Sequence, residues 1–218
     1  SGRGLVLQLN GAETLSIASN GSFTFPTAQR SGSTYDVRVS TQPLDPSQTC
    51  TVASGSGTVG SGAVRSVRVT CATDTFTLGG NVTGLLGSGL VLQNGGDAVE
   101  VQSDGSFTFA TRIASGGSYD VRVRTQPQNP TQSCSVENGT GRVANGNVTN
   151  VTVRCTTTTF TVGGTVSGLA GEGLVLQNNA ANDLAVNADG TFTFTTAVAS
   201  GRPYNVTVLA QPTSPTQQ

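Results

Sequence analysis

The sequence predicts an all-β protein made of tandem β-sandwich repeats of about 84 residues, a length within the usual range of small domains, each with an intradomain disulfide. Three observations predict this fold class. The sequence repeats three times, apolar residues alternate with polar ones, and cysteines recur in pairs with one spacing. Alternation with a period of two is the pattern of a strand with one buried face. The composition, dominated by glycine, serine, threonine, asparagine and valine, is too apolar and β-rich for a disordered chain.

The repeat is clearest in a glycine that is followed by Leu-Val-Leu-Gln. This motif starts at Gly4, Gly89 and Gly173, so its copies recur at nearly equal spacing. Two further motifs keep the same register along the chain. They are the Phe-Thr-Phe motifs within residues 20–25, 104–109 and 189–194, and the Tyr-x-Val-x-Val motifs at residues 35–39, 119–123 and 204–208. A period of this length suits a complete small domain and is too long for one rung of a solenoid.

Strands are expected throughout the middle repeat. Phe107 and Phe109 alternate with Ser106 and Thr108, which places both aromatic rings on one face. The Ser-Asp-Gly sequence at 103–105 favours a hairpin turn before them. The expected strands are 75–82, 90–93, 98–101, 107–111, 119–125, 135–143 and 148–155. Seven short strands separated by turn residues are typical of a two-sheet sandwich.

The repeats divide the chain into three expected domains. Residues 1–73 form a repeat without its first strand, residues 74–157 a complete repeat, and residues 158–218 a repeat without its C-terminal cysteine hairpin. Four residues separate Cys71 from Phe76, and four separate Cys155 from Phe160. Short linkers rich in β-branched threonine favour an extended chain, so the sequence predicts a semi-rigid rod.

The four cysteines fall into two pairs with equal spacing. Cys50 and Cys71 are separated along the chain by the same distance as Cys134 and Cys155. Of the three possible connectivities, the pairing within each repeat is favoured because the same pair recurs on neighbouring expected strands. A zinc site is the alternative, but the Cys-x-x-Cys spacing of zinc ligands is missing. Disulfides indicate a compartment outside the reducing cytosol.

The residues that the chain lacks bear on chemistry. It contains no histidine, lysine, methionine or tryptophan, and its formal net charge is −1. Without histidine the commonest general base and transition-metal ligand is missing, so we expect no enzyme, no cofactor and no metal site. The small net charge gives no reason to expect nucleic-acid binding. No apolar run approaches the roughly 20 residues that a membrane span needs.

Two polar clusters suggest chemistry at first sight. Asp97, Glu100 and Asp104 are placed where a glycosidase pair or a calcium site could be imagined, but the other repeats do not keep the charges. Turn and surface roles are therefore expected for these carboxylates. Residues 55–62 (GSGTVGSG) resemble a phosphate-binding loop, but they lack its lysine and precede a strand, so a β-turn is expected there.

Sugar binding is the strongest rival to a purely structural role. It usually needs exposed aromatic platforms, whereas the aromatic residues here recur at alternating strand positions and are expected in the core. The loops 94–98 and 178–183 are the places where such a site would lie. Separately, Arg38 and Arg122 lie near Asp36 and Asp120, which predicts cross-strand charge pairs that discourage edge association.

The third repeat also resembles a known group of domains. The residues concerned are 163–168 (GGTVSG), 189–194 (DGTFTF) and 200–208 (SGRPYNVTV). They are similar to transthyretin-like, Ig-like sandwich modules, including the carboxypeptidase regulatory-like and collagen-adhesin B-type repeats of bacterial surface proteins. The resemblance covers about two thirds of each repeat and implies stalks, spacers and fibre subunits. Collagen-adhesin B-type modules use lysine in an isopeptide bond, and this chain has no lysine.

The ends of the chain continue one pattern. The strand missing before residue 4 and the hairpin missing after residue 218 are both present in the middle repeat. We therefore expect either a window from a longer array or a subunit completed by strand exchange with a neighbour. The expected function is structural, in an extracellular or cell-surface fibre, filament or stalk of bacterial origin that self-associates. The alternative is an adhesin or carbohydrate-binding module that recognises a surface glycan.

Overall fold

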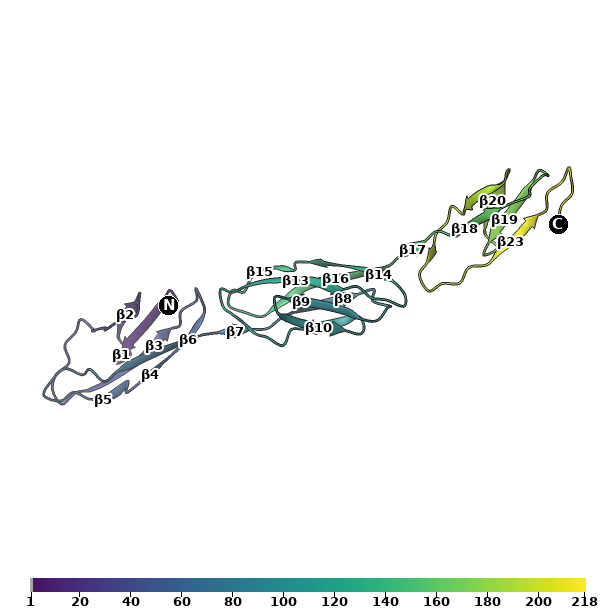
Figure 1. The fold of residues 1–218 in the computed structure, drawn as a ribbon. Helices are drawn as coiled ribbons and strands as arrows, with labels where there is room; N and C mark the ends of the chain where they lie inside the picture. Colours follow the sequence, from purple (N-terminus) through teal and green to yellow (C-terminus); the bar gives the residue numbers. More distant parts are fainter. Residues whose placement is uncertain (1) are drawn as a thin grey trace.

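The structure of the chain is a computed structural model that describes residues 2–218. These residues form strands and turns and contain no helix. None of the described residues therefore belongs to a helix that could cross a membrane. Three consecutive segments follow one another, and we call them the N-terminal segment (2–73), the central segment (74–157) and the C-terminal segment (158–218) (Figure 1).

The central segment contains two four-stranded sheets and a short two-stranded one. One sheet has the order β10-β9-β13-β15, the second has the order β11-β8-β16-β14, and β7 pairs with β12. The strands are β7 (Thr75–Phe76), β8 (Leu78–Thr83), β9 (Leu90–Asn94), β10 (Asp97–Val101), β11 (Gly105–Thr108), β12 (Ile113–Ala114), β13 (Ser118–Thr125), β14 (Gln132–Glu137), β15 (Thr140–Arg142) and β16 (Val148–Thr157). Strand β8 runs antiparallel to β11 and parallel to β16.

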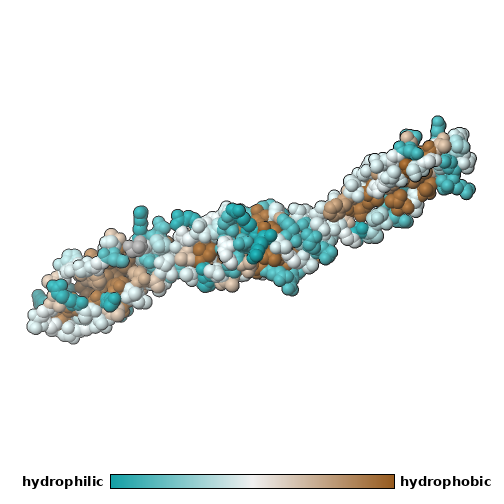
Figure 2. All heavy atoms as spheres, viewed as in Figure 1, coloured by the Kyte–Doolittle hydropathy of each residue, from teal (hydrophilic) through white to brown (hydrophobic). Residues whose placement is uncertain are grey.

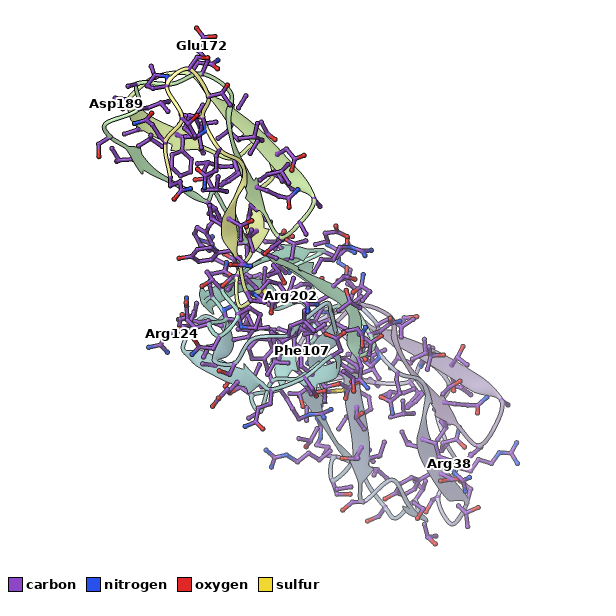
Figure 3. All side chains as sticks on the ribbon, turned by 90° about the vertical axis from the view of Figure 1, so that its right-hand side faces the viewer. Arg38, Phe107, Arg124, Glu172, Asp189 and Arg202 are labelled. Atoms are coloured by element: carbon purple, nitrogen blue, oxygen red, sulfur yellow. A yellow bond between two sulfur atoms is a disulfide. The ribbon has the colours of Figure 1, made fainter. Side chains whose placement is uncertain are left out.

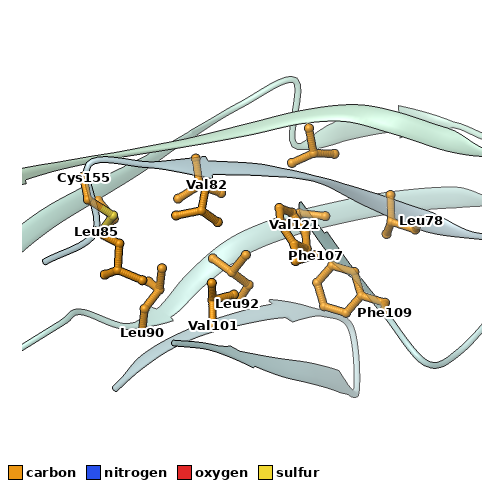
Figure 4. Packing of buried hydrophobic residues seen from close by; sticks show 13 residues of the cluster. Leu78, Val82, Leu85, Leu90, Leu92, Val101, Phe107, Phe109, Val121 and Cys155 are labelled. Atoms are coloured by element: carbon orange, nitrogen blue, oxygen red, sulfur yellow. A yellow bond between two sulfur atoms is a disulfide. The ribbon is translucent and has the colours of Figure 1, made fainter. Parts of the chain in front are cut away.

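One core takes side chains from both large sheets. Leu90 and Leu92 come from the first sheet, Leu78, Val82 and Val153 come from the second, and each has a relative exposure of 0%. Figure 4 shows Leu78, Val82 and Leu92 pointing into the same interior. Burial of leucine and valine side chains at about 1.5–3 kcal/mol each is the main force that holds the two sheets together.

The N-terminal segment repeats part of this arrangement. Its strands are β1 (Leu5–Leu9), β2 (Glu13–Ile17), β3 (Thr34–Thr41), β4 (Gln48–Ala53), β5 (Ser56–Thr58) and β6 (Arg68–Thr73). One sheet has the order β2-β1-β3-β5, but β4 and β6 pair only with each other. Residues 20–25, which correspond to β11, form no strand. The core here is smaller and is centred on Leu5, Leu7 and Leu9.

The C-terminal segment has the order β20-β19-β23 in its largest sheet. Its strands are β17 (Thr159–Phe160), β18 (Gly163–Val166), β19 (Leu174–Asn178), β20 (Asn182–Val186), β21 (Gly190–Thr193), β22 (Val198–Ala199) and β23 (Val206–Ala210). Strand β18 pairs with β21 alone, and β17 pairs with β22. Phe194 is the largest buried side chain of this segment.

Several expectations from the sequence are wrong in detail. The single strand expected at 75–82 is two strands, β7 and β8, which belong to different sheets, and the strand expected at 107–111 spans Gly105–Thr108. The single strand expected at 135–143 is two strands, β14 and β15, which belong to different sheets. Asn138 adopts a left-handed φ of 55° between them, which turns the chain from one sheet to the other. The aromatic residues are also not all in the core, since Phe160 is 53% exposed and Tyr204 is 65% exposed. Both lie in the C-terminal segment, where no counterpart of β14–β16 covers them.

The molecule is elongated, with its segments placed end to end (Figure 1). Its accessible surface is 13080 Å². A compact protein of 22.0 kDa would expose about 9,300 Å² by the usual scaling with mass. The excess surface is that of a rod, and Figure 2 shows hydrophobic residues at the surface of both terminal segments.

Candidate functional site: the joints and the open groove

The joint between the N-terminal and central segments is a closed set of hydrogen bonds. The Ser47 amide donates to the Ser115 hydroxyl oxygen (2.9 Å), and the Asp74 amide donates to the Ser47 carbonyl oxygen (3.0 Å). The Ser115 amide then donates to the Asp74 carbonyl oxygen (2.8 Å). Ser47 and Ser115 are 8% and 7% exposed. The bonds join one segment, the linker and the next segment, and burial limits competition from water.

The joint between the central and C-terminal segments is built in the same way. The Thr131 amide donates to the Ser200 hydroxyl oxygen (2.9 Å), and the Thr158 amide donates to the Thr131 carbonyl oxygen (3.0 Å). The Ser200 amide donates to the Thr158 carbonyl oxygen (2.8 Å). In the second joint, Thr131 and Ser200 occupy the positions of Ser47 and Ser115, and both keep a hydroxyl group. The linker position changes from aspartate to threonine, but its backbone bonds stay the same.

Each linker also forms part of the segment that follows it. Strand β7 pairs with β12, and strand β17 pairs with β22 in the same antiparallel register. A proline of the preceding segment lies over a glycine next to each joint serine. Pro46 faces Gly116, and Pro130 faces Gly201 so closely that an added Cβ would be 3.4 Å from the proline ring. The segments therefore meet through backbone bonds and direct packing.

Asp74 differs in its charge from its counterpart in the second joint. Hydrogen bonds from the hydroxyls of Ser47 and Thr49 lower the pKa of the Asp74 carboxyl below its ordinary value of 3.8. The Thr49 hydroxyl oxygen lies 2.7 Å from the carboxylate. The carboxylate is thus ionised at neutral pH, and it adds side-chain bonds that only the first joint possesses.

A buried glutamine fastens a later part of the central segment to the turn that follows β8, and a second glutamine does the same in the C-terminal segment. Gln132 is 2% exposed, and its side-chain oxygen accepts from the amides of Leu86 and Gly87 (2.7 Å each). Its side-chain nitrogen donates to the Gly84 carbonyl oxygen (2.7 Å). Gln217 makes the corresponding three bonds in the C-terminal segment. Within each of these two segments, the glutamine thereby holds together two stretches of chain that are far apart in sequence.

The structure contains both disulfides within segments. Cys50 is bonded to Cys71, and Cys134 to Cys155. Each bond joins two residues directly opposite each other, on β4 and β6 or on β14 and β16. The described part of the chain has no free cysteine. Two disulfides are typical of proteins in an oxidising, extracellular-type environment.

The N-terminal segment has an open groove beside β6. Its volume is about 910 Å³, and its lining includes apolar side chains from β1, from residues 20–25 and from β6. The residues that matter most are Phe23, Phe25, Val67 and Val69, all half-buried. At the corresponding positions of the central segment, the exposure is 6% or less: Phe107 6%, Phe109 2%, Val151 1% and Val153 0%. In the central segment β8 lies between β11 and β16 in one sheet, paired with Phe107 on one side and with Val151 and Val153 on the other.

Two of the three carboxylates noticed in the sequence, Asp97 and Asp104, accept hydrogen bonds from backbone amides, whereas Glu100 is exposed on β10. The Asp104 carboxylate accepts from the amides of Gly84 (2.9 Å) and Leu85 (2.7 Å), and Asp189 does the same for Gly168 and Leu169. The Asp97 carboxylate accepts from the Thr111 amide, and this bond is the main reason why the pKa of Asp97 is lowered. Within residues 2–218 no three acidic, cysteine or histidine side chains gather as metal ligands.

The arginine–aspartate pairs differ from the expected arrangement. Arg122 pairs with Asp120 two residues earlier on the same strand, β13, and Arg38 pairs with Asp36 on β3. Both strands lie inside their sheets, between two neighbours. The expectation of cross-strand pairs that protect an edge is therefore wrong. Figure 3 shows Arg38 and Arg124 pointing away from the molecule, whereas Phe107 lies inside it.

The loops considered for sugar binding are short turns. Residues 95–96 connect β9 to β10, and residues 179–181 connect β19 to β20. No aromatic residue belongs to either loop. The β-turn expected at residues 55–62 is wrong for Ser56–Thr58, which form β5 and pair with β3.

Comparison with known proteins does not assign the chain to a family. No protein-family model matches the sequence, and no curated protein is significantly similar to it.

Proposed function

We propose that the chain is an architectural segment of an extracellular fibre, filament or stalk, built from tandem Ig-like or transthyretin-like β-sandwich modules of about 84 residues, the size of a small domain. The observation that carries this proposal is the joint. Three hydrogen bonds recur with matching partners and lengths at both junctions, from Ser47, Asp74 and Ser115 to Thr131, Thr158 and Ser200. A joint that is repeated in this way sets the same relation between successive modules, as a rod requires.

The remaining features support the same role. The described surface is large for the mass, and the cysteine hairpins are closed by disulfides. Such hairpins withstand extracellular conditions without relying on a large core. The absence of histidine and lysine from the sequence removes the usual residues of hydrolytic and Schiff-base catalysis, which supports a non-enzymatic function.

The proposal also includes the origin and location of the protein. The resemblance of residues 163–208 to repeats of large bacterial surface proteins supports a bacterial, secreted or cell-surface array. In such an array the partner of each module is the next module, whether it belongs to the same chain or to a neighbouring subunit.

Electron microscopy of native, unreduced material tests this function. We expect filaments or rods whose axial repeat equals the length of one module. The double variant Ser115→Ala and Ser200→Ala should make the axial repeat less regular without unfolding the modules. Separate globular particles without an axial repeat would contradict the proposal, and rods that carry a distinct distal domain would move adhesive function to that domain.

A further inference from the structure

We propose that the open groove of the N-terminal segment is a binding site for one extended strand with the sequence pattern apolar–Gly–Gly–polar–apolar. The inference deepens the proposed function and rests on it, because it specifies the strand that would join one module of an array to its neighbour. In the central segment the equivalent groove is filled by β8.

The position of the strand follows from the pairing of β8. In the central segment Gly80 lies opposite Val151 and Val82 lies opposite Val153, in a parallel register. The corresponding residues of the N-terminal segment are Val67 and Val69, on or next to β6. Strand β6 pairs with β4 on one side only. Its other edge therefore offers backbone donors and acceptors to an incoming parallel strand, which is the usual chemistry of β-augmentation.

The apolar positions follow from burial. Leu78 and Val82 are both 0% exposed because they fill the space between the two sheets. The groove of the N-terminal segment presents the half-buried rings of Phe23 and Phe25 at the same place. An apolar residue at each end of a five-residue stretch would cover these rings, and burial of each such side chain favours binding.

The two glycines follow from backbone contacts. A Cβ atom at Gly79 would overlap the Phe107 carbonyl oxygen, and one at Gly80 would overlap the Val151 carbonyl oxygen. Side chains at these positions would push the strand away from both neighbours. The same pattern recurs in Val162–Val166, which has the sequence Val-Gly-Gly-Thr-Val. There, with no strand on the second side, a Cβ at Gly164 would meet only ring atoms of Phe192, at 3.1 and 3.2 Å. The carbonyl contact that requires glycine at Gly80 therefore has no counterpart at Gly164 within residues 158–218.

The test uses a fluorescent peptide with the sequence of residues 74–85 and the whole 218-residue chain. Fluorescence anisotropy should show saturable binding with one peptide per chain. The peptide that carries Gly80→Val should bind at least about tenfold more weakly, because its side chain overpacks the contact with the neighbouring backbone. Val69→Asp in the chain should weaken binding of the unchanged peptide, with circular dichroism as the check that the chain stays folded.

Hydrogen exchange gives a second, independent measurement. Bound peptide should slow the exchange of amides in β6 and in residues 20–25, and leave β9 and β13 of the central segment unchanged. No saturable binding, equal binding of the Gly80→Val peptide, or protection spread over all segments would each overturn the inference. Filament formation is scored separately. A chain that binds the peptide but never forms filaments would keep the strand site and contradict the fibre.

Discussion

Gly80 is the residue whose identity depends most directly on the packing around it. It lies in the middle of β8, where the Val151 carbonyl oxygen approaches from the parallel neighbour. Glycine inside a strand normally weakens the strand, so its presence here points to a close approach of backbone. Gly164 occupies the same position in β18, where that neighbour is missing and the glycine is exposed.

We predict that Gly80→Ala destabilises the central segment by about 1–3 kcal/mol, because the new Cβ must displace the backbone of β16. The matched control Gly164→Ala should change the stability of the C-terminal segment by less than about 0.5 kcal/mol, since its Cβ would touch only a movable ring. Hydrogen exchange measured segment by segment checks both values. Equal effects of the two substitutions would contradict the packing described for β8.

A second prediction at this scale concerns the pH dependence of the first joint. The folded pKa of Asp74 lies below its ordinary value of 3.8, so the ionised carboxylate stabilises the joint above that pH. This contribution disappears as the pH falls through the lowered pKa. At neutral pH, Asp74→Asn should therefore widen the distribution of distances between the first two segments relative to the unchanged chain. Once the pH lies below the lowered pKa, the two should behave alike. If the two distance distributions still differ at such acidic pH, the charge of the Asp74 carboxylate is not what stabilises the joint.

At the scale of elements, the cysteine hairpins constrain their strands differently in the two segments that have them. In the central segment β16 is held by β14 on one side and β8 on the other, whereas β6 is held by β4 alone. The disulfide is thus one of two constraints on β16 and the principal constraint on β6. Closing a loop with a sequence separation of 21 is worth about 3 kcal/mol in the chain-entropy model.

Replacing both cysteines of a pair by serine should accordingly have unequal effects. We expect Cys50→Ser with Cys71→Ser to release β4 and β6 into fast hydrogen exchange while the rest of the chain stays folded. We expect Cys134→Ser with Cys155→Ser to lower the stability of the central segment by about 3 kcal/mol and to leave β16 paired with β8. Protection of β6 that survives loss of its disulfide would contradict this view of the hairpin.

The sequence alone predicts most of these elements, because alternation at a period of two marks the strands and glycine marks the turns. It does not predict the break at Asn138, since residues 135–143 resemble one continuous strand and only the structure shows that they enter two sheets. It wrongly places Phe160 and Tyr204 in the core. Alternation shows which side chains share a face, but it does not show whether another sheet covers that face.

The joints could not be predicted from the sequence. Ser47 and Ser115 are far apart along the chain, and neither has a neighbour in sequence that indicates a partner. The one available signal is that Thr131 and Ser200 keep hydroxyl groups at the repeated positions. Such hydroxyls are common in this composition, so the signal gains meaning only when the hydrogen bonds are known.

At the scale of the whole molecule, the repeated joint and the large surface are both features of an extended rod. Segments connected by linkers of a few residues would still move independently if nothing fixed their contacts. Here each linker strand pairs with the next segment, and each joint serine bonds across the boundary. The chain should therefore behave in solution as one extended body.

Small-angle X-ray scattering of the intact, oxidised chain tests this claim most directly. A compact globule of 218 residues would have a radius of gyration of about 17 Å. We predict a clearly larger radius, with a scattering curve that a single rod of three aligned segments reproduces, and a more flexible ensemble for the Ser115→Ala and Ser200→Ala double variant. A radius near that of the globule, or a wild-type curve that only freely jointed segments can reproduce, would contradict the account.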